Sequence, residues 1–128
     1  MSDLFEPIAV VGIAGRLPGA RDVDEFWRNL VEGRDCISPL TDEQLLAAGV
    51  SRQQLEHPSY VKRAGLVPGL DMFDPGFFRM TPREAESCDP QQRLFLELTY
   101  EAIENAGYDP AAIGKEVAVY GASGPARY

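Results

Sequence analysis

The stretch at residues 86–107, ESCDPQQRLFLELTYEAIENAG, decides most of how this chain folds. Its Asp-Pro pair at 89–90 is typical of a helix start, because aspartate caps free N–H groups and proline at the first helical position leaves none unpaired. Apolar residues then recur at helical spacing, and Gly107 tolerates the positive φ that ends a helix. The sequence predicts a helix over 90–106. Its expected buried stripe is Leu94, Phe95, Leu98, Ala102, Ile103 and Ala106.

Four helix starts, three of them upstream of this stretch, are each marked by a Ser, Thr or Asp three residues before Gln or Glu. This is the spacing of a capping box, in which two side chains satisfy each other's backbone N–H groups. The four pairs are Thr41–Gln44, Ser51–Gln54, Thr81–Glu84 and Asp89–Gln92. We also expect a helix over 23–31, between Asp22 and Gly33, with one apolar face packed on a sheet.

Two short segments are apolar throughout, apart from one glycine and one tyrosine. They are IAVVGI at 8–13 and VAVY at 117–120. This pattern predicts strands buried inside a parallel sheet with helices on both sides, and therefore an α/β fold. Between them, residues 60–78 predict an irregular strand and loop. The rings of Phe73, Phe77 and Phe78, with Tyr60, are expected to form core.

Length, charge and the numbers of cysteines and histidines exclude several classes of protein. The 128 residues suit one domain or part of one, and 12 basic against 20 acidic residues give a net charge of −8, which disfavours nucleic-acid binding. The N-terminal apolar run is too short and too interrupted for a signal peptide or a membrane span, so we expect a cytoplasmic protein. With one histidine and two distant cysteines, Cys36 and Cys88, the sequence predicts reduced thiols and no metal site.

The glycines after the first predicted strand invite comparison with a phosphate-binding turn. Gly12, Gly15 and Gly19 follow a GxxGxxxG spacing instead of GxGxxG, and Pro18 prevents a helix from starting directly after the strand. A tight strand exit, where glycine avoids a Cβ clash, fits better than a nucleotide-binding α/β domain.

Cys88 is the residue whose chemistry matters most, because a thiol at a helix start can become a reactive thiolate. Here it immediately precedes the cap Asp89, whose carboxylate disfavours a thiolate and occupies the free N–H groups. The single histidine, His57, lies in a polar loop, where an exposed side chain is the expected state. We therefore expect Cys88 to be a buried or half-buried apolar thiol that packs beneath the helix start.

Arg83 and Arg93 each lie just inside a predicted helix start, near Glu84, Glu86 and Asp89. Ion pairs that lock the two helices together are the expected role, with binding of an anionic ligand as the alternative.

Several segments together resemble the N-terminal part of β-ketoacyl synthase domains, the ketosynthases of modular polyketide synthases. In order, they are EPIAVVGIAGRLPGA (6–20), EFWRNLVEGRDCIS (25–38), FDPGFFRMTPREAESCDPQQRLFLELTYEAIENAGYDP (73–110) and VAVYGASG (117–124). The resemblance covers almost the whole chain. By this resemblance, residues 1–6 are a short lead and residues 7–128 an incomplete ketosynthase segment.

The resemblance implies a thiolase-like fold of layered helices and mixed sheets, and a homodimer that catalyses decarboxylative Claisen condensation. A cysteine accepts the acyl chain from an acyl carrier protein, and two histidines assist condensation with a malonyl-type extender. No metal or separate cofactor is implied, since the phosphopantetheine arm of the carrier protein is part of the substrate.

Carried over residue by residue, the resemblance assigns no catalytic residue to this chain. The nucleophilic cysteine of the family lies in a Thr-Ala-Cys-Ser-Ser stretch, which is absent from this sequence. Cys36 and Cys88 differ from that cysteine both in their neighbouring residues and in their position along the domain. The motifs that contain the catalytic histidines are also absent. Asp89, Gln92 and Arg93 match a structural signature of the long helix. We expect an inactive segment of an acyltransferase. The alternative is part of a non-catalytic protein of the same fold, such as a chain-length-factor-like or scaffold subunit.

Two positions depart from the family pattern without disturbing the helix starts. Cys36 stands where a small alanine is usual, and Arg79 stands where glycine is usual. At the Cys88 position, related sequences commonly carry methionine or another apolar residue, which agrees with a packing role.

Overall fold

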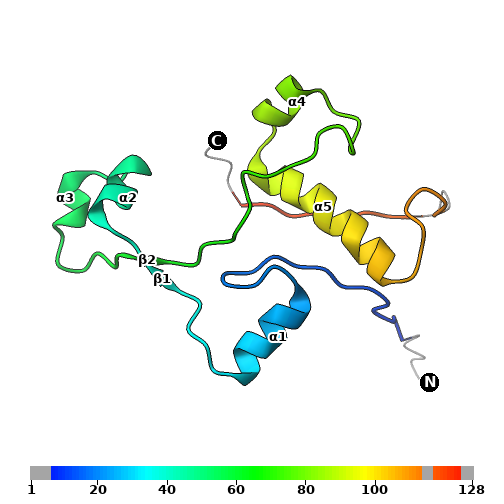
Figure 1. The fold of residues 1–128 in the computed structure, drawn as a ribbon, viewed down its shortest axis with the longest axis horizontal. Coiled ribbons are helices and arrows are strands. Elements are labelled where there is room, and N and C mark those ends of the chain that lie inside the picture. The colour runs from blue at the N-terminus through cyan, green and yellow to red at the C-terminus, as the bar shows by residue number, and fades with distance from the viewer. Residues whose placement is uncertain (1–6, 114–116, 125–128) are drawn as a thin grey trace, which may run out of the picture. The chain divides into compact units, whose positions relative to one another are not determined.

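The computed structural model describes residues 7–113 and 117–124, and it divides the chain into two compact units. One unit combines the residues up to Gly15 with those from Leu70 onward, and the other is the continuous segment Arg16–Gly69. Five helices and one pair of very short strands form within the described residues (Figure 1). We describe each unit by itself.

The first helix of the Arg16–Gly69 unit is α1 (Val23–Val31), as predicted. Its cap is Asp22, whose Oδ1 accepts from the Glu25 N–H at 2.7 Å. Asn29 is the buried polar residue of the helix, and its Nδ2 donates to the Gly19 carbonyl at 2.9 Å, which ties the helix to the turn before it.

The expectation that α1 packs its apolar face on a sheet is wrong for the described structure. Trp27 is 65 % exposed, and Leu30 and Val31 are also exposed. The reason is that the strands of this unit are only two residues long, so no sheet face large enough to cover a helix forms there.

Two short helices, α2 (Asp42–Ala47) and α3 (Arg52–Leu55), start at Thr41 and Ser51. Both reciprocal hydrogen bonds of the capping box form at each start, so these predictions are confirmed. Leu45 and Leu55 are buried and supply much of the small core of this unit.

The strands β1 (Ser38–Pro39) and β2 (Arg63–Ala64) pair antiparallel, with Ser38 opposite Ala64. Two ion pairs flank this ladder: Lys62 Nζ lies 2.6 Å from Asp42 Oδ1, and Arg63 Nη2 lies 2.5 Å from Asp35 Oδ2. The short β2 followed by loop agrees with the irregular segment predicted for 60–78.

The second unit contains α4 (Pro82–Ser87) and α5 (Pro90–Asn105), each with proline at its first position as predicted. The capping box of α4 is complete at Thr81 and Glu84. At the start of α5, Asp89 caps as expected but accepts from the Gln91 N–H at 2.8 Å. The predicted box at Asp89–Gln92 is therefore wrong in its pairing, because the Gln92 side chain accepts from the Cys88 thiol instead.

The end of α5 is also as predicted. Gly107 has φ +81°, its N–H donates to the Glu104 carbonyl at 2.8 Å, and the Tyr108 N–H donates to the Ile103 carbonyl at 3.2 Å. These two bonds form a Schellman motif, which satisfies carbonyls that the helix leaves free.

The two predicted buried strands are not present in the described structure, which is a correction. Residues 8–13 and 117–120 run as extended chain beside α5 without forming a sheet (Figure 1). Ile8 is 95 % exposed, Val10 86 % and Tyr120 92 %. A strand becomes buried only when neighbouring strands and covering helices are present. The described residues supply one helix, α5, on one side of these segments and no neighbouring strand.

The stripe predicted on α5 is half-buried instead of buried, and Phe95 is exposed. The aromatic cluster does form, with Phe73 stacked on Phe78 at 5.1 Å between ring centroids and Phe77 edge-on to Phe78. Its remaining ring is Tyr100, 4.8 Å from Phe77, whereas Tyr60 belongs to the other unit. Because Phe77 is 54 % exposed, the cluster is a half-covered patch and not the core that the sequence predicts.

Candidate functional site

A cleft of about 440 Å³ opens at the start of α5. It lies entirely within one unit, and residues 121–123 form one wall. The lining residues are Cys88, Gln91, Gln92, Phe95, Leu96, Gly121, Ala122 and Ser123.

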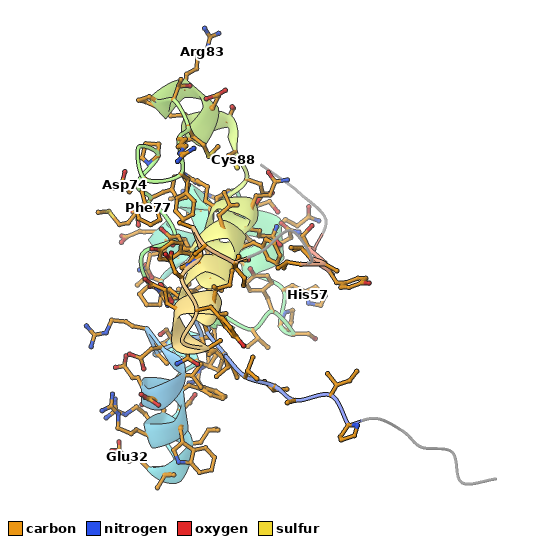
Figure 2. All side chains as sticks on the ribbon, turned by 90° about the vertical axis from the view of Figure 1, so that its right-hand side faces the viewer. Glu32, His57, Asp74, Phe77, Arg83 and Cys88 are labelled. Carbon is orange, nitrogen blue, oxygen red and sulfur yellow. The ribbon has the colours of Figure 1, made fainter. Side chains whose placement is uncertain are left out.

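Cys88 lies at the rim where α4 ends and α5 begins (Figure 2). Its backbone N–H donates to the Ala85 carbonyl at 3.3 Å, so it closes α4 while directly preceding the cap of α5. The thiol is half-buried and donates to Gln92 Oε1 at 3.4 Å. A thiol whose hydrogen-bond partner is a neutral amide oxygen is held as a donor, and no base is supplied at this contact.

The far wall of the cleft is fixed by Gln91, whose Oε1 accepts from the Gly124 N–H at 3.2 Å. Gly121 lies against the Phe95 ring, where an added Cβ would come within 3.2 Å of the ring edge. The cleft therefore offers apolar surface, two side-chain amides and one thiol. This set can hold a small apolar group, but it contains no acid–base pair for catalysis.

The two arginines near this cleft do not act as the sequence predicts. The ion pairs identified among residues 7–113 and 117–124 join Arg21 to Glu25, Arg34 to Glu32, Lys62 to Asp42 and Arg63 to Asp35. The expected pairs from Arg83 and Arg93 are not among them. Arg83 is exposed at the outer side of α4 (Figure 2), and Arg93 Nε is buried without a hydrogen-bond partner in the described residues.

His57 and Cys36 belong to the Arg16–Gly69 unit. His57 is exposed, as expected, and its Nδ1 accepts from the Ser59 N–H at 3.3 Å. Cys36 is half-buried and packs against Gly19. Gly19 has φ +71°, and a Cβ added there would lie 2.8 Å from the Cys36 Sγ. Both cysteines are free thiols.

The glycine-rich segment is a site of close packing. A Cβ on Gly12 would collide with the Ala102 carbonyl oxygen and with Ala106, and the neighbouring Ile13 N–H donates to Asn105 Oδ1 at 3.0 Å. Glycine at position 12 therefore avoids a Cβ clash, as predicted, but the clash is with α5 and the segment does not leave a strand.

Tyr100 has a perturbed phenol group that the sequence analysis did not identify. Partial burial raises the pKa of its phenol, and the carboxylates of Glu104 and Asp109 raise it further. The signal available in the sequence was the i, i+4 spacing of Tyr100 and Glu104 on one helix.

Metal binding and membrane insertion find no support in the part of the chain that the structure describes. Residues 7–113 and 117–124 contain no group of three or more His, Cys, Asp or Glu side chains placed to hold a metal ion. None of the helices found there has the length and apolar character needed to cross a membrane.

The sequence is similar to a known protein family and to several polyketide synthases. Residues 5–128 match the family described as "Beta-ketoacyl synthase, N-terminal domain". The chain is 50 % identical over 121 residues to a phenolphthiocerol/phthiocerol polyketide synthase of Mycobacterium tuberculosis, which covers 94 % of this chain and 8 % of that protein. It is 48 % identical over 111 residues to polyketide synthase ThaG of Burkholderia thailandensis, covering 85 % of this chain and 2 % of that protein.

The solved structures that resemble this chain are ketosynthases. An oxazolomycin ketosynthase domain from Streptomyces albus matches with a TM-score of 0.70 and 41 % identity, covering 83 % of this chain and 19 % of that one. The ketosynthase from module 6 of the bacillaene synthase of Bacillus subtilis matches with a TM-score of 0.67 and 40 % identity, covering 79 % of this chain and 17 % of that one. The chain thus spans less than a fifth of these ketosynthases.

Proposed function

The chain belongs to the family of β-ketoacyl synthase N-terminal domains, and on that premise we propose that it contributes the first part of a polyketide ketosynthase that catalyses decarboxylative Claisen condensation. The observation that carries the proposal is the match over residues 5–128 together with 41 % identity to a solved ketosynthase domain.

The fold class predicted from the sequence is confirmed. The structural neighbours are ketosynthase domains of the thiolase-like α/β class, and this chain corresponds to their N-terminal portion. We place the ketosynthase segment at residues 7–128, after a lead of six residues. Segment 8–13 and helix α5 are the parts of that scaffold that the described structure positions against each other.

In the proposed reaction, a cysteine thiolate outside this sequence takes an acyl group from a carrier-protein thioester and releases the carrier thiol. Loss of CO₂ from a malonyl-type thioester leaves an enolate, which attacks the acyl carbon and expels the cysteine thiolate. The product is a β-ketoacyl thioester on the carrier protein. The acyl carrier protein and a second ketosynthase copy are the proposed partners.

The proposed contribution of this chain is structural. Cys88 closes α4 and donates to Gln92, and the residues that line the described cleft include no general base. We therefore assign no catalytic, cofactor-binding or metal-binding residue to this sequence. No observation favours the alternative of a chain-length-factor-like or scaffold subunit.

The test is a hybrid domain in which residues 7–128 replace the corresponding segment of the Streptomyces albus oxazolomycin ketosynthase. The expected result is formation of a β-ketoacyl product from an acyl thioester and a malonyl-type extender, measured by mass spectrometry of the carrier protein. Replacing the host's nucleophilic cysteine by alanine serves as the negative control. A folded hybrid dimer without condensing activity would contradict the proposal.

The role of Cys88 is tested in the same hybrid and in the isolated chain. Cys88→Ala removes the bond to Gln92 but no reacting group, so the hybrid should keep its condensing activity within about twofold. The isolated chain should not be acylated at Cys88 by a thioester donor. Acylation that disappears in Cys88→Ala would overturn the structural assignment.

A further inference from the structure

We draw no further inference here: the strongest candidate, the cleft between the start of α5 and residues 121–123 with the Cys88 thiol at its rim, rests on a lone cysteine, and nothing in the described part of the chain shows what covers the cleft or which ligand would fill it.

Discussion

Arg79 is held at φ +55°, a left-handed conformation that is the only positive φ of a non-glycine residue within the described chain. Its N–H donates to the Gly76 carbonyl at 3.1 Å, and the following Met80 N–H donates to the Pro75 carbonyl at 2.8 Å, so the turn itself fixes this conformation. A side chain with a Cβ costs roughly 1–2 kcal/mol in the left-handed region. The turn before α4 therefore stores strain at one residue.

Arg79→Gly should stabilise the chain by about 0.5–1 kcal/mol, because glycine removes the Cβ strain but loses more entropy on folding. The urea midpoint of the transition measured by circular dichroism should rise accordingly. Arg79→Ala removes the same charge and keeps the Cβ, so it should give no such gain. Equal midpoints for the glycine and alanine variants would contradict the role of backbone strain.

Gly12 is the position where a single methyl group should disturb the packing most. A Cβ there meets the Ala102 carbonyl oxygen, which belongs to the backbone of α5 and cannot rotate away. Gly12→Ala should destabilise the chain by about 1–3 kcal/mol, measured by urea denaturation. Gly124→Ala is the control, because its Cβ would lie at an ordinary 3.5 Å from Gln91 Oε1. Similar effects at both glycines would rule out this contact as the cause.

At the scale of the elements, α2, α3 and α4 share one capping geometry but differ in charge. Gln44 and Gln54 are the neutral partners at the starts of α2 and α3, whereas Glu84 is the partner at the start of α4. The Glu84 carboxylate accepts from the Thr81 N–H at 2.7 Å and from its hydroxyl at 2.8 Å, and these bonds lower the pKa of Glu84 from its usual 4.5.

This difference makes α4 sensitive to acid. Because the pKa of Glu84 is lower in the folded chain than in the unfolded one, its stabilising effect is complete above about pH 4.5 and is lost as the pH falls through the lowered pKa. The Thr81 amide should show the transition in an NMR titration, while the Thr41 and Ser51 amides should not. Glu84→Gln should abolish the transition at Thr81. A transition that persists in this variant would assign it to another carboxylate.

The helices could be predicted from the sequence because their signals are local. Asp22, Thr41, Ser51 and Thr81 each act within three or four residues, and the structure places helix starts at all of them. Where one acceptor can bond to more than one donor, the pattern is insufficient: the Asp89 carboxylate accepts from the Gln91 N–H, and Gln92 Oε1 accepts from the Cys88 thiol. The candidate cleft depends on that choice and on segment 121–124, which lies far from Gln91 in sequence.

At the scale of the whole molecule, local sequence pattern cannot decide whether residues 8–13 and 117–120 form strands. The apolar character of residues 8–13 correctly identifies a segment suited to burial, but whether it becomes a strand depends on neighbours far away in sequence. In the described structure the segment finds α5 and no other strand. The same reason explains why Trp27 and Leu30, placed correctly on one face of α1, are exposed.

The exposed apolar surface of the whole chain should have a measurable effect. The isolated 128-residue chain should bind a hydrophobic dye such as ANS and should be marginally stable or aggregate at micromolar concentration. Val10→Asp should reduce the dye fluorescence, because Val10 lies in the exposed apolar segment 8–13, and Val61→Asp, at a single exposed valine of the Arg16–Gly69 unit, should reduce it less. A monomeric chain that melts cooperatively and binds no dye would show that the chain is a self-sufficient small domain.

The division into units has a consequence for engineering. Arg16–Gly69 is one uninterrupted stretch that leaves the other unit after Gly15 and returns to it at Leu70. The homologous stretch from another member of the family could therefore be grafted between these two points, with its own helix caps, strand pair and ion pairs. Recombination between genes of family members at these two junctions would exchange a whole compact unit while cutting no helix.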